Sequence, residues 1–296
     1  MENKTDNSSA GTKRSWEGLP LHNDGKSQRF PSTTMVESAS FDVLSMFEGF
    51  RDELDQHHDR RERLIKISRD ITALSKKMQT LQSPNHSHSR VRTAGAPIPP
   101  SILKDVQSRF TQINDLFLSA VPETQGLNNY RYLRNLSGGI QEFIEALSFK
   151  HYLETQTLIT REQVTSHLPP DILVTEDDYV MGLFDLTGEL MRFAVTSLSA
   201  GNHTENDENG DGLPRLPPAQ AGVVRDLREI RAEFEGVTIP RRHDYQIMRD
   251  WGKKTEIMCS SVEKVERAAY GILVRGSERP KGWKPDLSGP VEMDVY

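Results

Sequence analysis

The chain has 296 residues, a formal net charge of −6 at pH 7 and a single cysteine. One cysteine excludes an internal disulfide and a cysteine-based zinc site within one chain. The acidic net charge argues against a protein that coats nucleic acid with a generally basic surface, although it leaves room for a local basic patch. No apolar run is long enough to span a bilayer, and the N-terminus lacks the apolar core of a signal peptide. We therefore expect an intracellular protein without membrane contact.

Long helical patterns separated by polar segments run through the chain, with no clear succession of strands and turns. We expect an all-α protein with a disordered tail over residues 1–35, one helical domain over 36–280 and a C-terminal tail over 281–296. A linker over 83–100 and a mobile acidic loop over 200–218 interrupt this domain. The predicted helices cover residues 41–82, 101–120, 127–154, a short segment after Thr160, 178–197, 219–234 and 243–273.

Local signals set some of the helix boundaries. Thr160 and Gln163 stand three apart in the arrangement of a capping box, which predicts a short helix that begins after Thr160. Pro122 is expected to end the helix over 101–120, because proline interrupts the backbone hydrogen bonds of a helix. The helix over 127–154 is expected to bend, if anywhere, at Gly138 and Gly139.

Two of the predicted helices carry carboxylates on otherwise apolar surfaces. In the helix over 178–197, apolar residues surround almost the whole circumference, which is typical of a helix buried on nearly every side. Its one narrow polar stripe holds Asp185 and Glu189, one turn apart, with Arg192 beside them. In the helix over 137–154, Glu142 and Glu145 are three apart and share a side. Since burying an unpaired carboxylate is costly, these four acids require a physical explanation.

A divalent cation is one explanation for these acids. Carboxylate oxygens suit Mg²⁺ or Mn²⁺, and facing helices of a bundle commonly assemble such a site. The alternative is that the acids are solvated or paired with bases such as Arg192 and Lys150. A di-iron site fits poorly because it requires Glu-x-x-His on two helices, whereas the residues three after Glu142 and Asp185 are Glu145 and Gly188.

The predicted first helix is unusually basic between residues 58 and 77. Arg60, Arg61 and Arg69 in this segment are candidates for contacts with nucleic-acid phosphates. The alternative is a solvated face on which these arginines balance neighbouring acids. Lys150 and Arg192 are weaker candidates for phosphate contacts, since each has a plausible role in packing or in a salt bridge.

Four long blocks of the chain resemble, in order, those of the translin-associated factor X family within the translin superfamily. The blocks are HDRRERLIKISRDITALSKK (58–77), GGIQEFIEALSFKHYLET (138–155), DYVMGLFDLTGELMR (178–192) and VEKVERAAYGILVRGSERP (262–280). The resemblance covers about residues 41–280. It implies a bundle of about seven helices that assembles with translin into a hetero-octameric shell. It also implies an endoribonuclease that acts on single-stranded or nicked RNA in RNA silencing (passenger-strand removal) and tRNA fragment processing, in the cytoplasm and the nucleus.

The same resemblance places the acidic residues of the Mg²⁺-dependent catalytic site on Glu142, Glu145, Asp185 and Glu189. We expect these residues to bind Mg²⁺, or Mn²⁺, which would bind the scissile phosphate, activate a water and stabilise charge on the departing oxygen. Two alternatives stay open. An all-α nucleotide pyrophosphatase also holds Mg²⁺ with acidic pairs, although its second pair is usually spaced E-x-x-D rather than D-x-x-x-E. A non-catalytic RNA-binding scaffold that acts with translin would use the same acids only structurally.

Overall fold

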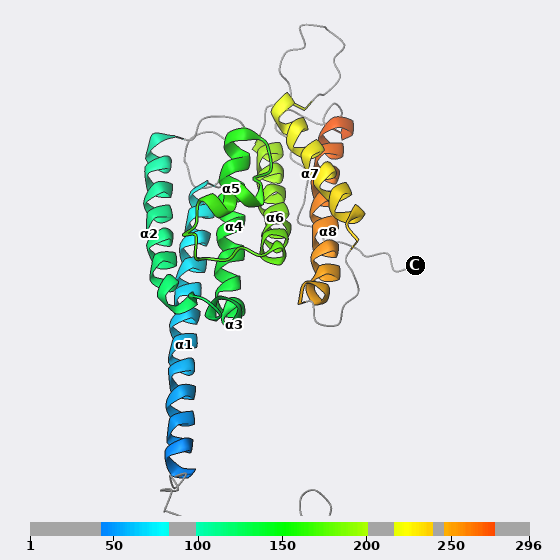
Figure 1. Ribbon diagram of the computed structural model, residues 1–296. Helices are drawn as coiled ribbons and strands as arrows, with labels where there is room; N and C mark the ends of the chain where they lie inside the picture. Colours follow the sequence, from blue (N-terminus) through cyan, green and yellow to red (C-terminus); the bar gives the residue numbers. More distant parts are fainter. Residues whose placement is uncertain (1–42, 83–98, 201–215, 239–245, 276–296) are drawn as a thin grey trace, which may run out of the picture. The chain divides into compact units, whose positions relative to one another are not determined.

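The computed structural model describes residues 43–82, 99–200, 216–238 and 246–275. Over these ranges the chain forms helices and no strand, which confirms the all-α prediction (Figure 1). The two predicted tails and most of the predicted linker and acidic loop lie outside the described residues. The helices are α1 (Val43–Gln82), α2 (Pro100–Thr124), α3 (Asn128–Arg131), α4 (Leu133–Thr155), α5 (Arg161–Ser166), α6 (Glu176–Ala200), α7 (Pro218–Gly236) and α8 (Gln246–Arg275).

Contacts divide the chain into two units, Met1–Phe50 and Arg51–Tyr296. In the first unit, the described residues are 43–50, which form the beginning of α1. There the rings of Phe47 and Phe50 pack edge to face, with centroids 6.1 Å apart, and both side chains are exposed. Because the division falls within α1 and residues 1–42 lie outside the described part, the domain boundary expected at residue 35 stays a prediction. The description below concerns the second unit.

Helices α4 and α6 form the centre of the second unit, because α4 contributes to both large hydrophobic clusters and α6 packs directly on α4. One cluster joins apolar side chains of α1, α2 and α4 to the segment around α5. The other joins the end of α4 to α6, α7 and α8. Phe184, Leu190 and Phe193 are all at most 3% exposed, so α6 is buried on most sides as its sequence predicted. No helix in the described ranges is long and apolar enough to cross a membrane.

The capping box before α5 is confirmed. The backbone N–H of Gln163 donates to Thr160 Oγ1 at 3.2 Å, and the N–H of Thr160 donates to Gln163 Oε1 at 2.8 Å. These two reciprocal bonds satisfy donors that the first turn of a helix cannot pair internally. The local sequence therefore determines where this short helix begins.

Two boundary predictions were wrong. Helix α2 continues through Pro122 to Thr124, because a proline in the last turn removes only one backbone bond and its fixed φ suits a helix. The carbonyl that loses its partner belongs to Leu118, which is 51% exposed and can be hydrated. The predicted helix over 127–154 is broken at Tyr132, between α3 and α4, and α4 runs unbroken through Gly138 and Gly139. Tyr132 is buried and its hydroxyl is hydrogen-bonded with His57 of α1, a tertiary contact that the local sequence does not reveal.

Candidate functional site

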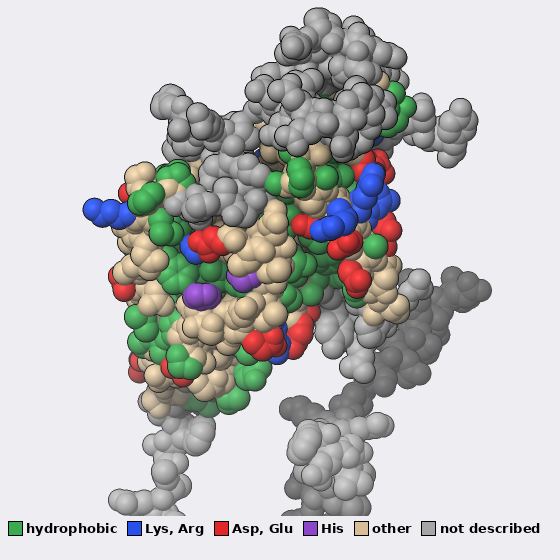
Figure 2. All heavy atoms as spheres, turned by 90° about the horizontal axis from the view of Figure 1, so that it is seen from above, with side chains coloured by type: hydrophobic (Ala, Val, Ile, Leu, Met, Phe, Trp, Pro, Cys, Tyr) green, Lys and Arg blue, Asp and Glu red, His purple; other side chains and the backbone are tan. Residues whose placement is uncertain are grey.

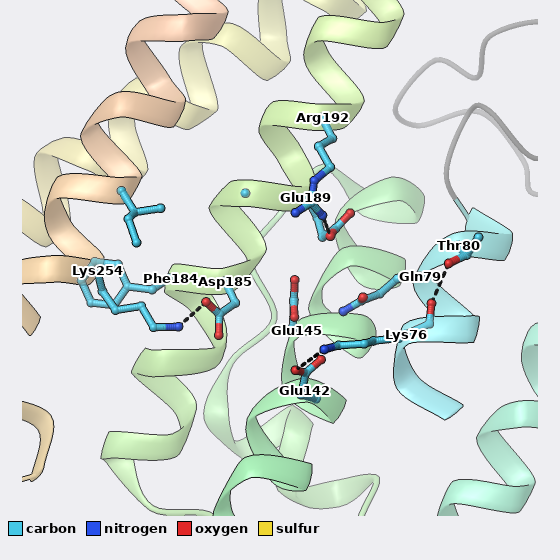
Figure 3. Close-up of a pocket in the computed structure, with 12 residues that line it drawn as sticks. Lys76, Gln79, Thr80, Glu142, Glu145, Phe184, Asp185, Glu189, Arg192 and Lys254 are labelled. Atoms are coloured by element: carbon cyan, nitrogen blue, oxygen red, sulfur yellow. Dashed lines mark hydrogen bonds and ion pairs between the residues drawn. The ribbon is translucent and has the colours of Figure 1, made fainter. Parts of the chain in front are cut away.

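The four acids singled out in the sequence line one cavity of about 840 Å³. Glu142 and Glu145 reach it from α4, and Asp185 and Glu189 reach it from α6 (Figure 3). Helices α1 and α8 supply further walls of the cavity. The charged residues of the lining are Lys76, Glu142, Glu145, Asp185, Glu189, Arg192 and Lys254.

Gly182 explains how the carboxylates of α4 and α6 come to face the same space. A Cβ at this position would lie 2.6 Å from Ile144 Cγ2, 2.8 Å from Ile144 Cβ and 3.1 Å from the carbonyl oxygen of Gln141. Only glycine therefore lets α6 approach α4 this closely without a shift of buried atoms. Ile144 directly precedes Glu145, and Gly182 lies three residues before Asp185, so this close approach sets the separation of the two acidic pairs.

Glu145 is the most deeply buried of the four acids, with 8% of its surface exposed. Burial, together with the neighbouring carboxylates of Asp185 and Glu142, raises the pKa of its carboxyl group to about 7, while Gln79 and Arg192 act in the opposite direction. A carboxyl group with such a pKa is in part protonated at neutral pH. Perturbed acids of this kind are concentrated at functional sites, although structural networks also produce them.

The other three acids are each paired with a cation. Lys76 Nζ of α1 lies 3.1 Å from Glu142 Oε1. Lys254 of α8 donates to Asp185, and Arg192 donates to Glu189 on the same helix. These pairs leave one carboxylate oxygen unpartnered, since Glu142 Oε2 is buried and has no hydrogen-bond partner.

The donor set fits a hard divalent cation, although the side chains do not converge on one point. All four acids offer carboxylate oxygens, which Mg²⁺ and Mn²⁺ prefer, and an orphaned buried oxygen belongs to one of them. Within the described ranges, however, no three His, Cys, Asp or Glu side chains are placed to hold one ion together. Three of the four acids face a cation instead (Figure 3). An ion would therefore have to compete with Lys76 and Lys254 for Glu142 and Asp185.

Sequence reasoning missed the two lysines of the cavity. Lys76 lies within the basic segment noted above, and Lys254 lies in the predicted last helix, but neither was distinguished from its basic neighbours. The sequence separation between Lys254 and Asp185 is 69 residues, so only the packing of α8 on α6 brings them together. An ion pair between two helices leaves no periodic pattern in the sequence of either helix.

The predicted RNA-binding residues are scattered over the structure, and only Arg192 lines the cavity of the acids. Lys150 binds Glu154 at 2.7 Å, as its salt-bridge alternative expected. Arg60 binds Glu123 of α2 at 3.0 Å rather than a neighbouring acid of its own helix. Arg61 and Arg69 are exposed on α1 and have no ion pair within the described part of the chain. On the face shown in Figure 2, acidic and basic side chains are intermingled. No broad basic surface is visible there, so a nucleic-acid contact would depend on local groups of cations.

Comparison with known proteins gives consistent similarities. Residues 59–276 match the model of the Translin family. The chain is 31% identical to Translin-associated protein X of Rattus norvegicus over 292 residues, which cover 88% of this chain and 90% of that protein. It is 29% identical to the Translin-associated protein X homolog of Schizosaccharomyces pombe, with 79% and 89% covered. Translin of Homo sapiens is more distant, at 27% identity, with 79% and 94% covered.

A solved structure shares the fold. The crystal structure of apo-NeC3PO aligns with a TM-score of 0.53 at 15% sequence identity and covers 79% of this chain and 97% of that chain. At this level of identity the likeness concerns the arrangement of helices alone.

Proposed function

The chain belongs to the Translin family, and from this premise we propose that it is the catalytic subunit of a metal-dependent endoribonuclease. The observation that carries the proposal is the meeting of two carboxylate pairs from α4 and α6 in one cavity, with Glu145 buried among them. A structural helix pair has no need for a buried acid whose pKa is raised to about 7. The free-energy cost of such a group is understandable where it serves binding or catalysis.

In this proposal, Glu142, Glu145, Asp185 and Glu189 hold Mg²⁺, with Mn²⁺ as an alternative. Such an ion supplies a Lewis acid for the phosphate and lowers the pKa of an attacking water. Glu145 must release its proton before it can act as a ligand, so binding is favoured as the pH rises through about 7. Glu142 and Asp185 must turn from their lysine partners, whereas Glu189 and Arg192 can adjust along the surface of α6.

We propose translin as the protein partner, in a hetero-oligomer that the family resemblance expects to be octameric. Relatives of this chain carry the name Translin-associated protein X. Large apolar side chains stand exposed on α8, where Tyr270 is 61% and Val274 is 45% exposed, and others are exposed near the beginning of α1. Apolar groups of this size suit a protein interface. Single-stranded or nicked RNA is the proposed substrate, with roles in RNA silencing and tRNA fragment processing in the cytoplasm and the nucleus.

One observation favours a non-catalytic scaffold as the second candidate function. Three of the four acids are ion-paired, and a purely structural role would need no more than these pairs. In that case the chain would bind RNA or its partner without cutting, and the acids would stabilise the contacts of α4 and α6 with α1 and α8.

The deciding experiment measures cleavage of a labelled single-stranded RNA by the chain co-expressed with a translin partner, in Mg²⁺ or in EDTA. Glu145→Gln and Asp185→Asn remove charge from the cavity, while Asp105→Asn removes it from an exposed position on α2. We expect cleavage by wild type and Asp105→Asn, only with the ion, and none by the two cavity variants. Equal cleavage by all four proteins would refute the assignment of the site.

Two further outcomes separate the alternatives. If none of the proteins cuts although the complexes assemble and bind RNA, the chain is a scaffold. If the wild type hydrolyses free nucleoside triphosphates to monophosphates and leaves RNA intact, the chemistry is that of a nucleotide pyrophosphatase.

A further inference from the structure

We propose that Lys76 and Lys254 bind the backbone phosphates on either side of the scissile one, so that the cavity takes a nucleic-acid strand rather than a mononucleotide. This inference rests on the proposed function, since it concerns the substrate of the same cavity. It assigns a role to two residues whose side chains form ion pairs with acids of the cavity. The steps below follow from their positions, their partners and the charge of the cavity.

The two lysines enter the cavity from opposite sides. Lys76 lies on α1 and is paired with Glu142 of α4, whereas Lys254 lies on α8 and is paired with Asp185 of α6. Figure 3 shows their ammonium groups on either side of the space into which the acids point. A strand that crosses from α1 to α8 would therefore meet one lysine, then the acids, then the other lysine.

The charge of the lining depends on whether the acids hold an ion. Four carboxylates face three cations, of which Arg192 pairs with an acid of its own helix. With all groups ionised and no further cation, the lining carries one net negative charge and does not attract phosphate. A bound divalent cation would turn this into one net positive charge. The cavity would then attract anions, as a cavity with converging cations does.

Competition for the carboxylates links the binding of a divalent cation to the release of the lysines. Glu142 and Asp185 cannot keep their full contact with a lysine and also bind an ion, because both cations seek the same oxygens. When these acids turn to the ion, two ammonium groups lose their partners at the edges of the cavity. Phosphate oxygens are the complementary groups that a strand supplies, and a lysine on its flexible stem can follow them. A mononucleotide can satisfy at most one of the two lysines while its phosphate occupies the centre.

The inference predicts that the same lysine substitution strengthens the binding of Mn²⁺ and weakens the binding of RNA. Lys76→Gln and Lys254→Gln remove a competitor for the acids, so each is expected to bind Mn²⁺ more tightly without RNA, by up to about five-fold, as expected for part-exposed ion pairs. The same variants lose a phosphate contact. Their binding of single-stranded RNA should weaken, and the slope of log K against log salt should fall by about 0.7 for each lysine and about 1.4 for the double variant.

Matched controls come from the same two helices. Lys77→Gln on α1 and Lys264→Gln on α8 remove the same charge from exposed positions that do not line the cavity. They should leave Mn²⁺ binding unchanged, so they should not combine tighter Mn²⁺ binding with weaker RNA binding. Lys76→Arg and Lys254→Arg keep the positive charge and should retain the salt dependence of the wild type, which separates loss of charge from a general disturbance of the fold.

The measurements use the complex with the translin partner. RNA binding is followed by fluorescence anisotropy in Ca²⁺, and Mn²⁺ binding by calorimetry. A nucleoside 5′-monophosphate serves as competitor, and it should displace the strand far less from the wild type than an oligonucleotide does. Weaker binding of both Mn²⁺ and RNA by the lysine variants would indicate a structural role and overturn the inference. Lysine variants that bind Mn²⁺ and RNA as their controls do would overturn it as well. If the wild type binds no strand at all, the proposed function itself fails.

Discussion

Replacement of Glu145 by glutamine tests whether the buried acid is kept for function at a cost in stability. The folded protein raises the pKa of Glu145 from 4.5 to about 7. Below about pH 4.5 the carboxyl group is protonated in both folded and unfolded chains, and above about pH 7 it is ionised in both. Between these values the unfolded chain releases its proton first, so stability is lost as the pH rises from about 4.5 to about 7.

The size of this loss follows from the shift in pKa. One pKa unit corresponds to about 1.4 kcal/mol, so the ionised Glu145 costs the folded protein up to about 3 kcal/mol at pH 8. Glutamine has nearly the same shape and no charge. Glu145→Gln should therefore leave the free energy of unfolding almost unchanged at pH 4.5 and raise it by about 1–3 kcal/mol at pH 8 in EDTA.

The assay is equilibrium urea unfolding at the two pH values, with EDTA or with saturating Mn²⁺. When the free ion is present at a concentration 100 times its Kd, its binding stabilises the folded wild type by about 2.7 kcal/mol. The variant should lose most of this stabilisation. Asp105→Asn, at an exposed position on α2, should show neither effect. A variant that is less stable than the wild type at pH 8 without the ion would refute the reasoning, because Glu145 would then be a structural acid.

Three substitutions test contacts that hold the helices in place, at the site and away from it. Gly182→Ala places a Cβ against Ile144 and should cost about 1–3 kcal/mol and weaken Mn²⁺ binding, whereas Gly222→Ala, which has no atom within 4 Å of its Cβ, should be neutral or stabilising in thermal unfolding. Asp178 accepts hydrogen bonds from Ser137 and Gln141 of α4, so Asp178→Ala should lower the free energy of unfolding by about 1–3 kcal/mol in urea; an unchanged midpoint would show that these bonds do not stabilise the fold. Thr160→Ala removes the cap of α5 and should cost about 1 kcal/mol, measured in the same way, with no change in Mn²⁺ affinity.

The local sequence alone determined the main helical segments, although not all of their boundaries. Apolar side chains around almost the whole circumference of the segment over 178–197 indicated a buried helix, and α6 is buried in this way. The capping box at Thr160 was also correct, because its hydrogen bonds join residues only three apart. The spacing within each acidic pair likewise indicated that Glu142 and Glu145, and Asp185 and Glu189, share a face. These are properties of a single helix, which its own residues determine.

Tertiary structure decided everything that depends on two helices at once. The break at Tyr132 reflects burial of its ring and its hydrogen bond with His57, 75 residues away in the chain. Gly182 controls the separation of α4 and α6 through contacts with Ile144 that no helical period reveals. Lys76 and Lys254 reach the acids only because α1 and α8 pack beside them. The sequence could thus predict which carboxylates belong to the candidate site, while the burial, pKa and cationic partners of those carboxylates arise from packing between distant segments.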